Sequence, residues 1–236
     1  MANEKMQALF DKIGSFNYED TLKKILQSIK KPNILVCGGT GVGKSSLINY
    51  VFGKDVAQVG EGTAVTAEIR RYASETASIV LYDTIGYEIG AAKQQEFYEK
   101  VVQFVKDRNA LSEVADHIHL IWYCISAANK RVTAMDIAAI RTFAETTKIC
   151  VALTQADSTT AEELRQMEQV LQEKLPHIPY FVVSVDTRMP KEMVGWDKLV
   201  QWSMNNLDSG LRLAFAQALG QELDVKKTQA DTIIKR

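Results

Sequence analysis

Apolar residues along this chain fall into two alternating patterns. Short uninterrupted apolar runs, such as 33–37 and 119–125, predict strands that are buried on both faces of a sheet. Apolar groups at helical spacing, as in 94–111, predict helices with one buried face. Strands that alternate with helices are typical of a mainly parallel sheet covered on both sides. Further strands are expected over 67–72, 78–82, 148–153 and 180–185, and further helices over 46–52, 133–146, 161–175 and 196–207.

The two ends of the chain carry helical patterns of their own. We expect a helical N-terminal arm over residues 1–31, a three-layer α/β domain over 32–208 and an amphipathic helical extension over 209–236. The extension has no stop signal at its end. It either begins a further domain of a longer protein or folds back on the central domain, and the sequence leaves both interpretations open.

Composition narrows the class of protein. The 236 residues carry a formal net charge of −1, so nothing draws the whole chain to nucleic acid, DNA included, or to an anionic membrane. Because the N-terminus lacks a secretory pattern and no apolar run approaches about 18 residues, we expect a cytoplasmic protein, with membrane association of a full-length form left open. The cysteines Cys37, Cys124 and Cys150 lie in apolar runs and predict buried free thiols.

One glycine-rich segment carries the strongest chemical signal. Residues 38–45 read GGTGVGKS, which fits G-x-x-x-x-G-K-[ST] between a predicted strand and a predicted helix. Backbone N–H groups and the positive end of a helix dipole then converge on one point, which attracts phosphate. Lys44 is expected to neutralise the β and γ oxygens, and the Ser45 hydroxyl to enter a Mg²⁺ shell; the alternative is a glycine turn with a chance lysine. The predicted contacts are Gly38, Gly39, Thr40, Gly41, Val42, Gly43, Lys44, Ser45 and Ser46.

Two further segments predict contacts to the metal and the γ-phosphate. Asp83 opens the sequence DTIG, where its carboxylate is expected to hold Mg²⁺ through water and the Gly86 N–H to bond the γ-phosphate. The polar residues 60–66 have the composition of a switch loop that γ-phosphate and Mg²⁺ order. We expect Thr66 to complete the metal shell, with Thr63 as the alternative and a solvent-facing threonine as the plainer interpretation. The predicted catalytic residues are Lys44, Thr66 and Gly86, and the predicted metal ligands are Ser45, Thr66 and Asp83.

Residues 154–157 read TQAD and follow a predicted strand, where they are expected to choose the base. A buried Asp157 can accept hydrogen bonds from N1–H and the exocyclic amine of guanine, a donor pair that adenine lacks, and so selects GTP over ATP. A backbone contact to the base oxygen is expected after the last strand. The predicted base contacts are Thr154, Gln155, Asp157, Ser184 and Val185.

The chain resembles the translation-factor-like P-loop GTPases, and within them the Era/TrmE-type group, over residues 32–207. The segments that carry the resemblance are, in order, GGTGVGKSS, a threonine near 66, DTIG, TQAD and SVD. The resemblance implies a Ras-like G domain that binds GTP and GDP and hydrolyses GTP with Mg²⁺. The segments GTGVGKSSLIN and HLIWYCI are also similar to Era-like bacterial GTPases that continue into an apolar helical C-terminal domain, and residues 215–236 are similar to the start of that continuation.

Three positions depart from the family pattern. Gln155 replaces the lysine that packs along the base; the aliphatic stem survives but the charge does not, so a modest nucleotide affinity is expected. Gly41 stands where potassium-dependent members carry asparagine, so K⁺-activated hydrolysis is not expected. Tyr87 follows DTIG where Ras carries a water-orienting glutamine, so intrinsic turnover is expected to be slow, with a partner or a second copy supplying what is missing.

Three functional classes follow from these residues. The leading interpretation is a GTPase switch; the alternatives are a nucleotide-dependent assembly module with negligible hydrolysis and an ATP-using P-loop kinase, against which residues 83–86 and 154–157 argue. A guanine nucleotide is the expected partner. A homodimer through the nucleotide face, and a ribosome or membrane partner reached through the terminal helices, stay open.

Other residues with candidate chemistry have plainer interpretations. His117, His119 and His177 lack metal-ligand spacing and are expected to be structural. Lys130 and Arg131 are candidates for a cationic finger acting on a second copy, but a solvated loop pair is the expected interpretation.

Overall fold

The fold was analysed in a computed structural model of the chain, which describes residues 30–52, 63–66, 69–73, 79–84, 91–184, 195–212, 214–216 and 218–219. The chain divides into two units, Met1–Lys30 and Lys31–Arg236, and the elements below belong to the second unit. The predicted N-terminal arm and the end of the predicted extension lie outside the described residues.

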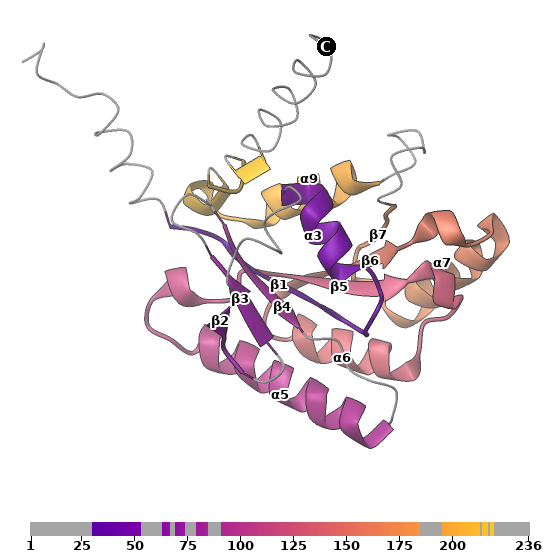
Figure 1. Cartoon of the computed structure of the whole chain (residues 1–236), viewed down its shortest axis with the longest axis horizontal. Helices are drawn as coiled ribbons and strands as arrows, with labels where there is room; N and C mark the ends of the chain where they lie inside the picture. The colour runs from indigo at the N-terminus through magenta and orange to yellow at the C-terminus, as the bar shows by residue number, and fades with distance from the viewer. Residues whose placement is uncertain are drawn as a thin grey trace, which may run out of the picture. The chain divides into compact units, whose positions relative to one another are not determined.

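One sheet of seven strands lies at the centre of this unit, in the order β2-β3-β4-β1-β5-β6-β7 (Figure 1). Its strands are β1 (Asn33–Gly38), β2 (Thr63–Ala64), β3 (Ile69–Tyr72), β4 (Val80–Thr84), β5 (Leu120–Ser126), β6 (Lys148–Thr154) and β7 (Tyr180–Val182). Strand β1 pairs in parallel with β4 and β5, and β6 pairs in parallel with β5 and β7. Only β2 and β3 run antiparallel to their neighbours. The predicted mainly parallel sheet is confirmed, and β2 forms where the sequence predicted a flexible loop.

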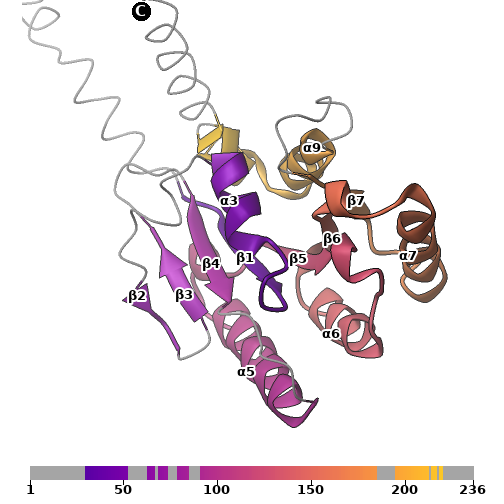
Figure 2. The ribbon, with the colours of Figure 1, turned by 45° about the vertical axis from the view of Figure 1, so that its right-hand side comes forward.

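Helices cover both faces of the sheet (Figure 2). They are α3 (Lys44–Phe52), α5 (Ala91–Asn109), α6 (Ala134–Ala144), α7 (Ala161–Lys174) and α9 (Trp196–Asn206), with short 3₁₀ turns η1 (Val114–Asp116), η2 (Ala127–Asn129) and η3 (Ala156–Ser158). Helices α5, α6 and α7 contribute to one apolar core, and α3 and α9 contribute to the other. This three-layer arrangement confirms the predicted fold class.

Strand β5 shows why its sequence is apolar without interruption. Ile121 and Tyr123 belong to the core below α5 and α6, while Trp122 belongs to the core below α3 and α9. Both faces of the strand are therefore buried. The indole N–H of Trp122 donates a hydrogen bond over 3.0 Å to the buried Ser203 hydroxyl on α9, which satisfies the one polar atom of this side chain.

The described part of the C-terminal segment packs on the sheet. Leu211, Ala214 and Phe215 are buried in the core beside α3, and the rings of Phe52 and Phe215 meet edge to face at 5.8 Å. Of the two interpretations that the sequence left open, this part of the segment follows the second and folds back on the domain. The predicted domain boundaries stay a prediction. Among the described residues, no helix combines the length and the apolar character that a membrane span requires.

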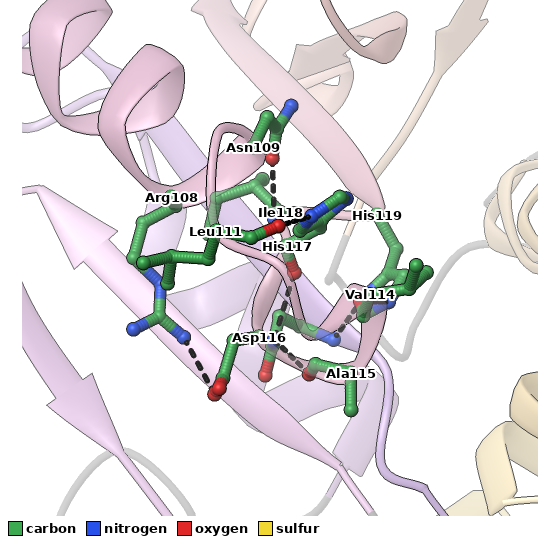
Figure 3. Close-up of polar contacts among 10 residues, drawn as sticks. Arg108, Asn109, Leu111, Val114, Ala115, Asp116, His117, Ile118 and His119 are labelled. Carbon is green, nitrogen blue, oxygen red and sulfur yellow. Dashed lines mark hydrogen bonds and ion pairs between the residues drawn. The ribbon is translucent and has the colours of Figure 1, made fainter.

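The loop between α5 and β5, whose polar contacts Figure 3 shows, also fixes the start of β1, the strand that leads into the glycine-rich segment. The Asn33 side-chain amide donates to the carbonyls of Ala115 and His117 at 2.8 and 2.7 Å. The backbone N–H of Asn33 donates to Nδ1 of His119 over 2.9 Å, and the His119 N–H donates back to the Asn33 carbonyl. His119 therefore has the structural role that the sequence predicted.

The geometry fixes the protonation state of His119. A backbone N–H can only donate, so Nδ1 must be unprotonated, and the proton sits on Nε2, which donates to the Val114 carbonyl over 3.0 Å. Burial lowers the pKa of His119 from its usual 6.5, and the Val114 hydrogen bond and the charge of Asp208 oppose this shift. The unfolded chain then binds this proton more readily than the folded chain.

We expect the contribution of His119 to the free energy of unfolding to decline as the pH falls below about 6.5, because its depressed pKa contributes stability that is complete only above that value. His119→Asn keeps an acceptor near Nδ1 without a titrating group, so its free energy of unfolding should fall less between pH 7.5 and pH 5. Urea unfolding at the two pH values measures this, with His177→Asn as the matched control. Equal losses in the wild type and His119→Asn would contradict it.

Candidate functional site

The predicted site residues gather at one edge of the sheet. Strands β1, β4, β5 and β6 end there, and their last residues are Gly38, Thr84, Ser126 and Thr154. Because all four strands are parallel and consecutive in the sheet order, their carboxyl ends lie on the same edge. Open α/β sheets bind their ligands at this edge.

The glycine-rich segment turns where no side chain would fit. Gly38 has φ +140°, and a Cβ on it would lie 2.2 Å from the Cys124 carbonyl oxygen of β5. Gly43 has φ +88°, in the left-handed region that favours glycine. The Leu47 N–H then donates to the Gly43 carbonyl over 2.9 Å, which begins the hydrogen bonding of α3. The segment therefore delivers the N-terminus of α3 to the edge of the sheet, as the sequence predicted.

Lys44 is buried within this turn. Its Nζ donates to the carbonyls of Gly38 and Gly39 at 3.2 and 2.9 Å. These contacts hold a positive charge at the N-terminus of α3, where the helix dipole already favours an anion. The arrangement suits a phosphate group, which would take the place of weaker carbonyl acceptors.

Asp83 lies beside the turn at the end of β4, and one of its oxygens is unsatisfied. Its Oδ2 accepts a hydrogen bond from the Ser45 hydroxyl at 3.5 Å, while Oδ1 is buried and has no hydrogen-bond partner among the described residues. Burial raises the pKa of Asp83 to about 6, against the opposing effects of the Lys44 charge, the Ser45 hydrogen bond and the Arg70 charge. A buried, unpaired carboxylate oxygen calls for an explanation, and a hard cation supplies one.

The donors around Asp83 suit Mg²⁺ better than a transition metal. Within the described part of the chain, no group of three or more His, Cys, Asp and Glu side chains could hold a metal ion. Mg²⁺ usually takes only one or two protein oxygens and fills its shell with water and phosphate. The Ser45 hydroxyl and the Asp83 carboxylate fit that requirement.

The third predicted metal ligand, Thr66, lies in the turn between β2 and β3. It is exposed, and its backbone exchanges hydrogen bonds with Ile69 at 3.3 and 3.4 Å. Ile69 pairs with Thr84, so this turn belongs to the same edge of the sheet as Asp83. Its role as a ligand stays a prediction. Gly86, Tyr87 and Val185 lie outside the described residues.

The base-side segment is tied to the glycine-rich turn. The buried Thr154 hydroxyl donates to the Val42 carbonyl, and the Gln155 Nε2 donates to the Gly41 carbonyl over 3.1 Å. The Ser126 hydroxyl donates in turn to the Gln155 Oε1. Sequence reasoning missed Ser126, because no motif marks it; only the pairing of Ser126 with Thr154 across β5 and β6 brings it here.

The structure corrects one expectation about Asp157. Its side chain is exposed rather than buried, and its two oxygens accept hydrogen bonds from the hydroxyls of Ser184 and Ser158 at 2.6 and 3.2 Å. Ser184 is fully buried, and the expected backbone contact to the base stays a prediction. The carboxylate is therefore held by a buried residue that follows β7 in the chain. Each oxygen retains a lone pair for a further donor.

Comparison with known proteins now adds to this geometry. Residues 33–185 match the family described as 50S ribosome-binding GTPase. The chain belongs to this GTPase family.

Individual relatives agree with the family. The GTPase is 30% identical over 105 residues to a probable GTP-binding protein EngB of Methanococcus maripaludis, a match over 42% of this chain and 44% of that protein. It is 24% identical over 162 residues to septin-10 of Mus musculus, over 61% of this chain and 36% of that protein. The chain thus spans less than half the length of these curated relatives.

A solved structure supports the fold. The crystal structure of a probable GTP-binding protein engB resembles the GTPase with a TM-score of 0.50 at 15% identity, over 76% of this chain and 98% of that chain. The P-loop GTPase class is confirmed. The narrower Era/TrmE-type assignment is not confirmed.

Lys130 of the GTPase does not stand free for a second copy. Its ammonium forms a 2.8 Å ion pair with Glu163, which also accepts from the N–H of Thr160 at the start of α7. These hydrogen bonds, that of Lys130 first, lower the pKa of the half-buried Glu163 to about 2. The pairing favours the structural interpretation of Lys130.

We predict that Asp83→Asn stabilises the metal-free GTPase at neutral pH. The pKa of Asp83 is raised from 3.8 to about 6, so it contributes stability that is present below pH 3.8 and is lost as the pH rises through 6. At 1.36 kcal/mol for each pH unit, the loss amounts to at most about 3 kcal/mol. Urea unfolding with a chelator should show the variant gaining over the wild type between pH 4.5 and 7.5. Asp107→Asn, on the exposed face of α5, is the control. A constant difference across that range would show that Asp83 is not strained by burial.

Proposed function

We propose that this chain binds GTP and GDP together with Mg²⁺ and hydrolyses GTP to GDP and phosphate as a molecular switch. The proposal rests mainly on one observation: two buried charged groups of opposite sign, Lys44 and Asp83, lie at the same edge of the sheet. Lys44 offers an ammonium at the N-terminus of α3, and Asp83 offers an unpaired oxygen beside Ser45. A magnesium-bound triphosphate satisfies both, because it presents anionic oxygens and a cation at once.

Each residue has a separate task in this proposal. Lys44 and the N–H groups of the glycine-rich turn bind and orient the phosphates, and they stabilise the charge that develops during transfer to water. Ser45 and Asp83 hold Mg²⁺, which supplies further neutralisation of the phosphate oxygens when bound. Thr66 closes the metal shell from the turn before β3, and the Gly86 N–H contacts the γ-phosphate. Loss of that phosphate releases both segments, which is the switch.

Base selection falls to Asp157. Its carboxylate is held by Ser184 and Ser158 while keeping lone pairs for the two donors on the edge of guanine. Gln155 lies beside it and provides an aliphatic stem without charge. These contacts support GTP over ATP and argue against a kinase that uses ATP.

A second candidate is a nucleotide-dependent assembly module with negligible hydrolysis. Tyr87, in place of a glutamine that orients water, favours it. Single-turnover hydrolysis over a range of protein concentrations separates the two: a rate that rises with concentration supports a switch activated by a second copy, and no phosphate release supports the module. The family description names the large ribosomal subunit, so binding to that subunit is the first macromolecular interaction to test. Such a partner would place the protein in the cytoplasm.

We predict that Lys44→Ala abolishes measurable binding of GTP and GDP. The change removes the cation held at the loop, and charge-assisted hydrogen bonds contribute about 1.5–3 kcal/mol each, so affinity should fall by about 100-fold or more. Calorimetry with Mg²⁺ measures it, and Lys174→Ala at the end of α7 is the control. Thermal unfolding confirms that the variant is folded. Unchanged affinity in a folded variant would refute the site.

We predict that Asp157→Asn moves the preference from guanine toward xanthine nucleotides. The amide replaces one acceptor with a donor, which suits the additional oxygen of xanthine. Competition of GDP and xanthosine diphosphate for a labelled nucleotide measures the ratio. Ser184→Ala should weaken GDP binding without this reversal, because it loosens the carboxylate but leaves its chemistry unchanged. Equal GDP affinity in Asp157→Asn would place base recognition elsewhere.

A further inference from the structure

Two hydrogen bonds join the base-side segment to the glycine-rich turn, and a third, from Ser126, supports one of them. Gln155 Nε2 donates to the Gly41 carbonyl, Ser126 donates to Gln155 Oε1, and Thr154 donates to the Val42 carbonyl. The Gly41 carbonyl can only accept, so the Gln155 amide has one orientation, which turns its oxygen toward Ser126. Two successive carbonyls of the turn are therefore held from the base side.

Holding these carbonyls also sets two N–H groups. In a planar trans peptide, the carbonyl of one residue points opposite to the N–H of the next. The Gly41 carbonyl therefore fixes the Val42 N–H, and the Val42 carbonyl fixes the Gly43 N–H. Both N–H groups point away from the base-side segment. They belong to the set of backbone donors with which a glycine-rich loop of this pattern binds phosphate.

Packing alone does not hold this part of the turn. A Cβ built on Gly41 has nothing within 4 Å, and its φ of +74° is one that glycine leaves readily. On Gly43, the same construction lies 3.7–3.8 Å from Thr154 and the Gln155 side chain. Gln155 itself has φ +54°, in the left-handed region that few residues other than glycine adopt. The polar contacts of Thr154 and Gln155 therefore orient the peptide groups together with the packing of the buried Val42 side chain.

We propose that Gln155 is a positioning residue for the phosphate-binding N–H groups and that Ser126 acts through it. This inference rests on the proposed function. The neutral amide orients the peptide groups of residues 41–43 toward the position of the β-phosphate of the nucleotide. It contributes no charge of its own. Base recognition and phosphate recognition are then coupled through one side chain.

The test compares the affinities of GDP, GMP and inosine diphosphate in the full chain with Mg²⁺. Gln155→Met keeps the stem and removes both polar contacts. We expect its GDP affinity to fall about tenfold relative to GMP, a loss within reach of one well-placed hydrogen bond. The ratio of GDP to inosine diphosphate, which reports base recognition by Asp157, should not change. A variant that is only partly folded loses all three affinities alike.

Three further variants sharpen the comparison. Gln155→Lys retains a donor toward Gly41 and should keep the GDP-to-GMP ratio of the wild type. Ser126→Ala should lower that ratio several-fold, yet have no effect when added to Gln155→Met. Gln172→Met on α7, whose amide donates to the Tyr180 hydroxyl over 2.7 Å, makes the same chemical change away from the site and should alter nothing.

The outcomes separate this inference from the proposed function. An unchanged GDP-to-GMP ratio in Gln155→Met, a parallel loss of all three affinities, or an altered ratio of GDP to inosine diphosphate each overturns the inference and leaves the function standing. A wild-type chain that binds neither GDP nor GTP overturns the proposed function, and this inference with it.

Discussion

The close approach of β1 to β5 at Gly38 is the constraint from which the site follows. In the parallel register Gly38 lies opposite Cys124, and its Cα passes so near the Cys124 carbonyl that a side chain would overlap it. The chain leaves the strand there with φ +140° and turns at once into α3. Because Leu47 and Ile48 anchor α3 in the core, the first turn of that helix has a fixed place over the edge of the sheet. A longer or bulkier connection would carry its N–H groups elsewhere.

Burial makes the charges at this edge effective. Lys44 is satisfied only by carbonyls of its own turn, and Asp83 keeps an oxygen with no hydrogen-bond partner among the described residues. Both groups have lost water, which costs free energy that the chain alone does not recover. An anion alone would be attracted by the Lys44 ammonium but repelled by the Asp83 carboxylate. A cation alone would be attracted by Asp83 but repelled by Lys44. The site therefore favours a ligand that brings both charges together, and this is why metal and phosphate are expected to bind cooperatively.

Local sequence patterns predicted much of this architecture. The apolar runs 33–37 and 119–125 lie on strands buried from both sides, so the pattern and the environment coincide. The glycine-rich segment is also local, since its loop and helix are contiguous. The contacts of Ser126 and Ser184 escaped prediction because they depend on which residues face each other across β5, β6 and β7. The exposure of Asp157 could not be foreseen, since it depends on how η3 leaves the sheet. Strand β2 is only two residues long and pairs on one side, which leaves no periodicity to detect.

The antiparallel edge of the sheet belongs to the electrostatics of the site. Arg70 of β3 pairs in register with Asp83 of β4, and its charge lowers the pKa of that carboxyl against the effect of burial. Arg70 is exposed, so solvent weakens this influence. The same strand begins just after the turn that contains Thr66. The position of Arg70 on β3 therefore affects the charge state of Asp83, the proposed metal ligand.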